Sequence, residues 1–370
     1  MTAAVRVAVN LTWIAPGRVG GSEEYLVRQL SGLPDDGLIE PTVFCQTAFV
    51  EAHPEVADRF PVVTVPLRRD LRATRIVAEH TWLAARTRSA DIVHHGGGTA
   101  PLVGRRPIVL TVHDLQYLRY PEYFQRIRHS YLDRMMPRSA RRAAIVTVPS
   151  AYVRRTVVEA FGIDHDNVVV VPHGVPDLEP PSEADVSTVL GRYGLADRPF
   201  VVYPAITHPH KRHRVLIDML AHLDPEIAVV LVGGAGTAEN DVRHAIAVSA
   251  HRDRVVRTGR VADVDRNALI WSASALVFPS EYEGFGAPLV EAMVLATPIV
   301  CSAAEAVAEV AGEAAVVISE STPQAWAAGV HLALGERERL VELGRERRRE
   351  FTLEIAGRAL ADAYRLAAGS

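Results

Sequence analysis

The sequence predicts an α/β protein of two domains, each built on a parallel sheet. Three observations support this prediction. The chain has 370 residues, more than one hydrophobic core usually supports. Short Val- and Ile-rich runs alternate with amphipathic stretches in both halves, and runs that are apolar throughout are typical of parallel strands covered by helices on both faces. A proline-rich, acidic segment then separates the two halves.

The first half contains the runs that we predict as the strands of one sheet. They are Val5–Val9, Pro41–Cys45, Val62–Val65, Asp91–His94, Ile108–Val112, Ile145–Val148 and Val168–Val171. Between them, residues 22–33 and 150–161 have apolar positions at helical spacing. Ser22 and Ser150 stand at their starts, where a serine side chain can cap the first backbone N–H groups.

The second half repeats this rhythm after residues 176–185 (PDLEPPSEAD), which we interpret as the interdomain linker. Its strands are predicted at Phe200–Tyr203, Ala228–Val232, Val255–Thr258, Leu276–Phe278, Ile299–Cys301 and Val316–Ile318. The expected domains are residues 1–177, joined by a C-terminal helix at 352–370, and residues 186–351. Two such domains are expected to face one another, with the carboxyl ends of their strands on a shared cleft.

The composition is that of a soluble globular protein, with 48% hydrophobic and 23% charged residues. No apolar run approaches the ~20 residues of a membrane span, and the N-terminus lacks the pattern of a signal peptide. Cys45 and Cys301 lie in apolar runs and are predicted to be buried thiols in a reducing compartment. The expected location is therefore the cytoplasm.

Charge is unevenly distributed along the chain. Residues 1–177 hold 21 basic and 18 acidic residues, whereas residues 178–370 hold 19 basic and 26 acidic ones. This is either ordinary solvated surface or a first domain that meets an anionic acceptor or the inner face of a membrane. The basic residues are scattered, and no aromatic stacking platform accompanies them, so nucleic acid is not an expected partner.

Lysine is almost absent from the chain. Of the 40 basic residues, Lys211 is the one lysine. An ammonium on a flexible stem grips a phosphate as a point charge, which the planar fork of arginine does not do. The isolated lysine therefore suggests a phosphate-binding role.

The segment 278–300 (FPSEYEGFGAPLVEAMVLATPIV) combines a strand end, a glycine-rich turn and a helix opened by Pro288. Glycines let the backbone approach a ligand, and a helix N-terminus attracts anions. Glu283 stands in the turn and Glu291 eight residues later, and paired carboxylates accept hydrogen bonds from sugar hydroxyls. The alternative is that both glutamates are ordinary surface residues.

Lys211 itself lies in YPAITHPHKRHR, after a strand, a turn and Pro209. That is the place for a phosphate-binding cation in an open α/β sheet. The three nearby histidines, at 208, 210 and 213, do not have the spacing of a metal site, and no metal is expected.

Three further segments are candidates for a site. The loop at 17–25 (GRVGGSEEY) can cradle phosphate or simply turn the chain, and no G-x-G-x-x-G pattern indicates a dinucleotide enzyme. His113-Asp114 follows a strand and is expected at the ligand-binding edge, the alternative being a packed histidine beside a capping aspartate. His94-His95 is either a loop at the cleft or a turn, and the D-x-D triplets at 164–166 and 263–265 fit loop or capping roles.

With these residues the sequence resembles the retaining glycosyltransferases of family 4, which have the GT-B fold. The block PSEYEGFGAPLVEAM matches the E-x7-E motif of the family, with Glu283 and Glu291 as its acids. Weaker matches follow the same order along nearly the whole chain: GGSEEYLVRQL, TVHDLQYLRYPEYF, VTVPSAYVRRTV, VVVPHGV, PHKRH, LVGGAG, TGRV and AEVAGEAA. The HDL and P-x-K segments are similar to those of mannosyl- and rhamnosyltransferases.

The resemblance implies a nucleoside-diphosphate sugar as donor and a sugar, lipid-linked or small-molecule hydroxyl as acceptor, without a cofactor. It implies that Glu283 contacts the transferred sugar, Glu291 the ribose, and His113 the sugar from the acceptor domain. The base is implied to lie near Arg260 and Val261. The donor diphosphate is implied to bind Lys211 and backbone amides of Gly20, Gly21, Gly284, Phe285, Gly286 and Ala287.

This chain also departs from the pattern of the family. An arginine usual five or six residues before the lysine is absent, and His208 or Arg212 is the expected replacement. Ala296 stands where a glycine is usual, and a tryptophan usual near the last helix is missing around Leu353. The alternatives are another GT-B enzyme, such as a nucleotide-sugar epimerase or a phosphorylase, and an inactive subunit that binds a partner.

Overall fold

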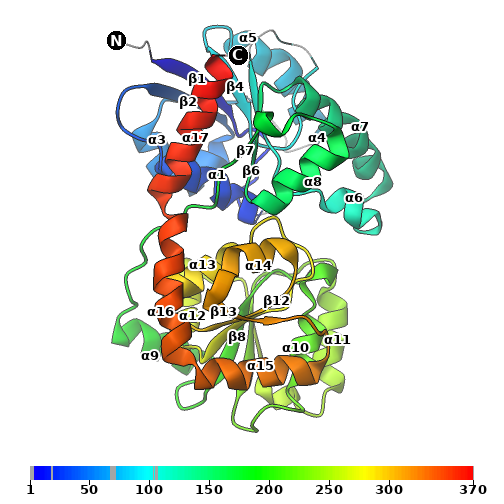
Figure 1. Cartoon of the computed structure of the whole chain (residues 1–370), viewed down its shortest axis with the longest axis vertical. Coiled ribbons are helices and arrows are strands. Elements are labelled where there is room, and N and C mark those ends of the chain that lie inside the picture. Colours follow the sequence, from blue (N-terminus) through cyan, green and yellow to red (C-terminus); the bar gives the residue numbers. More distant parts are fainter. Residues whose placement is uncertain (1–3, 18–19, 67–71, 103, 105–106, 370) are drawn as a thin grey trace. The chain divides into compact units, whose positions relative to one another are not determined.

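A computed structural model describes residues 4–17, 20–66, 72–102, 104 and 107–369 (Figure 1). The chain divides into two compact units. The first comprises Met1–Pro176 together with Phe351–Ser370, and the second comprises Asp177–Glu350. None of the helices in the described ranges has the length and apolar character of a membrane span.

The first unit contains a seven-stranded parallel sheet in the order β3-β2-β1-β4-β5-β6-β7. The strands are β1 (Val5–Asn10), β2 (Ile39–Cys45), β3 (Val62–Thr64), β4 (Ile92–His95), β5 (Ile108–Thr111), β6 (Ile145–Val148) and β7 (Val168–Val170). Its helices are α1 (Gly21–Ser31), α2 (Thr47–Ala52), α3 (Pro54–Arg59), α4 (Arg72–Ala78), α5 (Ala84–Arg86), α6 (Gln116–Arg119), α7 (Arg126–Arg142), α8 (Ala151–Phe161) and α17 (Leu353–Ala368).

The second unit contains a six-stranded parallel sheet in the order β10-β9-β8-β11-β12-β13. The strands are β8 (Phe200–Pro204), β9 (Ala228–Val232), β10 (Val255–Gly259), β11 (Ala275–Phe278), β12 (Ile299–Ser302) and β13 (Ala315–Ile318). Its helices are α9 (Glu183–Arg192), α10 (His213–Met219), α11 (Glu239–Val248), α12 (Asp263–Ser272), α13 (Ala287–Val294), α14 (Glu305–Ala311), α15 (Pro323–Gly335) and α16 (Arg337–Arg347). The predicted α/β class with two parallel sheets is confirmed.

Each sheet has a point at which the strand order reverses. In the first unit the chain builds outward from β1 to β3 and then returns to place β4 on the other side of β1. In the second unit the same reversal places β11 beside β8. The helices after two such strands leave on opposite faces, which opens a crevice at their carboxyl ends where α/β proteins bind ligands.

Helix α17 completes the first unit, although it comes last in the sequence (Figure 1). Leu360 and Tyr364 are buried in the same apolar cluster as Val7 and other residues of β1 and α1. A side chain on Gly357 would bring its Cβ to 1.8 Å from the carbonyl oxygen of Gly32, so this close helix contact requires glycine. The Tyr364 hydroxyl also lies 2.8 Å from Nδ1 of buried His94.

Several local predictions are confirmed. Ser150 caps α8, because its hydroxyl accepts a hydrogen bond from the Val153 amide at 3.2 Å. Pro288 lies at the start of α13. Cys45 and Cys301 are buried free thiols, and burial raises the pKa of each to about 12.

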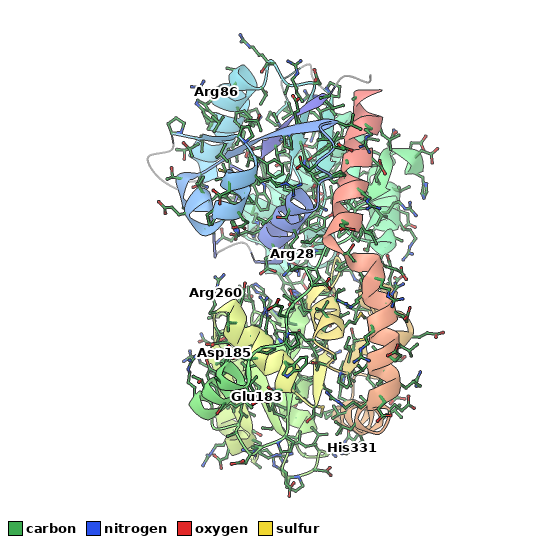
Figure 2. The ribbon with its side chains drawn as sticks, turned by 90° about the vertical axis from the view of Figure 1, so that its left-hand side faces the viewer. Arg28, Arg86, Glu183, Asp185, Arg260 and His331 are labelled. Atoms are coloured by element: carbon green, nitrogen blue, oxygen red, sulfur yellow. The ribbon has the colours of Figure 1, made fainter. Side chains whose placement is uncertain are left out.

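Other local predictions are wrong. Ser22 does not cap α1, because the chain turns at Gly20, with φ 71°, and the helix starts one residue before the serine. The linker is shorter than predicted: Ser182 caps α9, so residues 183–185 are helical, with Glu183 and Asp185 in the first turn (Figure 2). His94 and His95 form no loop, since they end strand β4 and are buried.

Ala296, which stands where the family usually has glycine, has a left-handed backbone conformation. Ala296 has φ 54°, a conformation that costs an L-residue other than glycine about 1–2 kcal/mol. The chain turns there between α13 and β12, and this turn explains on physical grounds why glycine suits the position. The second unit therefore carries a small backbone strain at the turn that leads into β12.

Candidate active site

The crevice between β8 and β11 brings together the two residues that the sequence singled out most strongly. Lys211 ends a single 3₁₀ turn, Pro209–Lys211, in the loop after β8, and Glu283 lies in the loop after β11. The Lys211 ammonium donates a hydrogen bond to the Glu283 carboxylate. Their side chains are 18% and 14% exposed, so the charges pair in a largely dry place that solvent still reaches.

A helix start lies on the same loop as Glu283. Gly286, with φ 102°, precedes the first helical residue, Ala287, and gives the chain the left-handed turn that α13 requires. Phe285 is buried and anchors the loop, while Gly284 is partly exposed. The positive end of the α13 dipole therefore points to the edge of the sheet where Lys211 lies, an arrangement that favours an anion.

Glu291 lies on α13 itself and is more deeply buried than Glu283. It is 3% exposed, and its Oε2 is 3.8 Å from Nε of Arg266 in the first turn of α12. Arg266 also pairs with Asp263, at 3.0 Å. Because α13 begins only after Glu283, the two glutamates come from different elements, and they have different partners, Lys211 and Arg266. Arg266 was missed in the sequence, since nothing in its spacing connects α12 to Glu291.

The residues expected to replace the absent arginine form other contacts. The Nδ1 of His208 lies 3.2 Å from the Thr237 hydroxyl, and burial, followed by the Lys211 charge, lowers the pKa of its ring. Arg212 has φ 52° and donates to the Ser321 hydroxyl at 2.7 Å. The structure does not join either side chain to the Lys211–Glu283 pair by a hydrogen bond.

The predicted base-binding residues follow β10. Arg260 is exposed and is labelled in Figure 2, and Val261 is partly buried. Both precede α12, the helix that carries Arg266. They therefore lie in the segment that leads to the Arg266–Glu291 contact.

A buried polar network, which sequence reasoning missed, braces the neighbouring loop after β9. Glu239 accepts hydrogen bonds from Thr207 at 2.7 Å, Arg257 at 3.0 Å and Arg243 at 2.8 Å. Burial by itself would raise the pKa of this carboxyl, but the three hydrogen bonds and the Arg257 charge lower it to about 2. Thr207 also accepts from the Gly236 amide at 2.7 Å, so the loops after β8 and β9 are held together.

In the first unit, His113 follows β5 at the carboxyl edge of that sheet. Its Nε2 lies 2.8 Å from the Gly96 carbonyl oxygen and must donate to it. The ring packs against those of Trp13 and Tyr25, and burial lowers its pKa to about 4. Near neutral pH the ring is therefore uncharged, with Nδ1 as its lone-pair nitrogen.

The glycine loop follows β1, which β4 separates from β5 in the sheet. Gly20 precedes α1 with φ 71°, and Gly21 is the first residue of that helix. Residues 18 and 19 of the predicted loop lie outside the described residues. Across the described ranges, no group of three or more His, Cys, Asp or Glu side chains is arranged to hold a metal ion.

Comparison with known protein families agrees with this geometry. A family model described as Glycosyltransferase Family 4 matches residues 19–177, and a second, described as Glycosyl transferases group 1, matches residues 192–350. With two parallel α/β units and a charged site at the reversal of strand order, the protein is a glycosyltransferase of the GT-B fold. It belongs to the group 1 glycosyltransferases of family 4, as the resemblance indicated.

Curated relatives are themselves glycosyltransferases. The chain is 28% identical to the O-antigen chain mannosyltransferase B of Escherichia coli, over 75% of this chain and 74% of that protein. It is also 28% identical to a 2-deoxystreptamine N-acetyl-D-glucosaminyltransferase of Streptomyces fradiae, over 95% of this chain and 92% of that protein.

Solved structures agree in fold. Anabaena HepE in complex with UDP and glucose superposes with a TM-score of 0.77 at 20% identity, covering 97% of this chain and 98% of that chain. A sucrose-phosphate synthase from Thermosynechococcus elongatus superposes with a TM-score of 0.76 at 21% identity, with 98% of each chain covered. These likenesses confirm the GT-B fold.

Proposed function

We propose that the protein is a retaining, metal-independent glycosyltransferase that moves a hexose from a nucleoside-diphosphate sugar to a hydroxyl acceptor. The observation that carries the proposal is the Lys211–Glu283 pair at the crevice between β8 and β11. It combines a cation for phosphate with a carboxylate for sugar hydroxyls, next to the N-terminus of α13.

The reaction needs stabilisation of the negative charge that grows on the departing diphosphate. In the proposed mechanism Lys211 and the start of α13 provide that stabilisation, as a fixed charge and a fixed dipole. Glu283 then accepts hydrogen bonds from the transferred sugar. The oxygen of the acceptor hydroxyl bonds to the anomeric carbon on the face from which the diphosphate leaves, and its proton passes to the departing diphosphate oxygen. The configuration at the anomeric carbon is therefore retained.

For the sugar, we propose a mannose- or rhamnose-like hexose, supported by the mannosyltransferase relative from Escherichia coli. For the donor, the support is the fold likeness to HepE, whose structures contain UDP or UDP-glucose. Glu291 and the segment at Arg260 and Val261 are proposed to bind the nucleoside. His113, Gly20 and Gly21 of the first unit are proposed to bind the donor, as the resemblance to the family implies.

A product assay tests this function directly. Incubation with a panel of nucleoside-diphosphate sugars and polyhydroxy acceptors should yield a glycosylated acceptor, and the yield should survive EDTA, because a lysine and a helix dipole replace the cation. Loss of activity in EDTA with recovery in Mg²⁺ or Mn²⁺ would contradict the proposed leaving-group site. Conversion of the donor without acceptor would indicate an epimerase instead.

We further propose that the first unit meets an anionic membrane surface at the cytoplasmic face. Helix α7 has six arginines and one acid, Asp133, and its Ile127 is 87% exposed. Each basic residue near an anionic bilayer contributes about 1 kcal/mol to binding. Arg134 and Arg138 are exposed on this helix.

Sedimentation with phosphatidylglycerol vesicles measures this contact. Changing Arg134 and Arg138 to glutamate should weaken binding by about tenfold or more. The same two charge reversals at Arg345 and Arg349 of the second unit should leave binding unchanged. The proposal would be contradicted if both double variants bound the vesicles equally well. It would also be contradicted if the wild-type protein bound phosphatidylcholine vesicles as well as phosphatidylglycerol vesicles.

A further inference from the structure

We infer that Tyr203 is a positioning residue of the active site, whose hydroxyl sets the alignment of the Lys211 loop with the Glu283 loop. The inference rests on the proposed function, because it assigns Tyr203 to the same phosphate and sugar site. Neither the sequence motifs nor the family comparisons point to this tyrosine. It lies in β8 and is fully buried.

The Tyr203 hydroxyl links the two loops directly. It donates a hydrogen bond to the backbone carbonyl oxygen of Lys211 at 3.0 Å. It also lies 2.8 Å from the hydroxyl oxygen of Ser280, three residues before Glu283. A phenol has a single proton, so when Tyr203 donates to Lys211, Ser280 must donate to the phenol oxygen. One buried oxygen thus connects the backbone of the cation's loop to the loop of the carboxylate.

Two neighbouring hydrogen bonds extend this link, and together with it we call them the frame of the site. The Glu281 amide donates to the His210 carbonyl oxygen at 2.9 Å, which is a second connection between the same loops. The Ser302 hydroxyl, at the end of β12, donates to the Ser280 carbonyl oxygen. The ends of β8, β11 and β12 are therefore connected through Ser280, and Tyr203 extends the connection to Lys211.

The ring of Tyr203 is held so that the hydroxyl points to this junction. It packs edge-on against Phe278, with ring centroids 5.6 Å apart, and lies tilted against His213, with ring centroids 4.9 Å apart. Phe278 also lies under the Lys211 ammonium, 5.9 Å from its ring centroid. Burial, followed by the Glu283 charge, raises the pKa of the phenol well above its usual range, so the hydroxyl remains a donor throughout the working pH range.

The consequence concerns turnover more than binding. Catalytic groups must be held to within a fraction of an ångström, and a displacement of about 1 Å can cost 10²-fold in rate. A donor diphosphate can still draw the Lys211 side chain toward itself when the loops are looser. The alignment needed in the transition state depends on the frame, so its loss should lower kcat and leave the affinity for a nucleoside diphosphate nearly unchanged.

The first test is Tyr203→Phe, which deletes the hydroxyl and keeps the ring. We expect kcat to fall by about tenfold, with the Kd for the nucleoside diphosphate product within about twofold of wild type. The matched control is Tyr364→Phe, which removes an equally buried hydroxyl, bonded to His94, from the first unit. This control should lower thermal stability and leave kcat unchanged. Equal kcat losses in both variants would contradict a positioning role.

The second test is a double-mutant cycle with Lys211→Ala. Because Tyr203 acts through Lys211, adding Tyr203→Phe to Lys211→Ala should cause no further loss of kcat. A full additional tenfold loss would overturn the inference. If Lys211→Ala lowers kcat while Tyr203→Phe keeps the wild-type kcat, the inference is wrong but the proposed function stands. Wild-type activity of Lys211→Ala would overturn the proposed function, and the inference with it. If Tyr203→Phe does not fold, Ser280→Ala breaks the same link from the other loop and should give the same coupled loss.

Discussion

Replacing Lys211 by alanine should lower kcat/KM by about 10²-fold or more, the scale for one lost electrostatic contact to a transition state. In the structure Lys211 is paired with Glu283, and this ion pair holds its charge at the crevice. In the proposed mechanism this charge stabilises the departing diphosphate. Steady-state kinetics with a nucleoside-diphosphate sugar measure the loss.

Two comparisons make this result specific. Lys211→Arg keeps the charge but replaces a point charge by a planar fork, and we expect it to recover only part of the rate. Arg214→Ala removes a cation three residues away that is 76% exposed and pairs with Asp218, and it should behave as wild type. If Lys211→Ala keeps the wild-type kcat/KM, the ammonium has no catalytic role.

Glu283→Gln and Glu291→Gln should have different kinetic effects. Glu283 pairs with Lys211 at the edge of the sheet, whereas Glu291 is buried beside Arg266 on α12. An interaction that tightens in the transition state shows in kcat, and one made equally in the ground state shows in KM. We therefore expect Glu283→Gln to lower kcat while nucleoside diphosphate affinity stays nearly intact. Glu291→Gln should mainly weaken binding of donor and free nucleoside diphosphate.

Product inhibition and steady-state kinetics on both variants decide the assignment. The structure adds a reason for the Glu283 result: removing its charge releases Lys211, which is then free to bind phosphate. The reverse pattern, with affinity lost in Glu283→Gln and kept in Glu291→Gln, would exchange the two roles. Wild-type behaviour of both variants would mean that the motif is structural in this chain.

The fold could be predicted from sequence because each of its signals is local. A run such as Ala228–Val232 is apolar throughout, and that pattern alone identifies a strand with two covered faces. The motif of the candidate site is equally local, since Glu283, Gly286 and Pro288 lie within six residues. The strand predicted at Asp91–His94 was right for His94, but the interpretation of His94-His95 as a loop or a turn was wrong, because a histidine at a strand end looks like the start of a loop. Its partners, Tyr364 and Thr111, are distant in sequence and keep it inside the sheet.

The frame around the site could not be predicted, for the same reason. In the sequence Tyr203 looks like one more core residue of a strand, and the hydrogen-bond partners of its hydroxyl belong to Lys211 and Ser280. Likewise Thr207, Glu239 and Arg257 sit in three separate segments and become one network only when β8, β9 and β10 are placed side by side. The spacing of residues along the chain does not predict such long-range hydrogen bonds.

The place of α17 bears on the order in which the chain can be built during translation. The second unit is one uninterrupted stretch, whereas the first needs residues from both ends of the sequence. The ribosome therefore delivers all of the second unit before Leu360 and Tyr364, which close the apolar cluster around Val7 and Leu26. Until then α17 does not cover that cluster, and transiently exposed apolar surface binds chaperones and is prone to aggregation. The unit that is begun first is the one completed last.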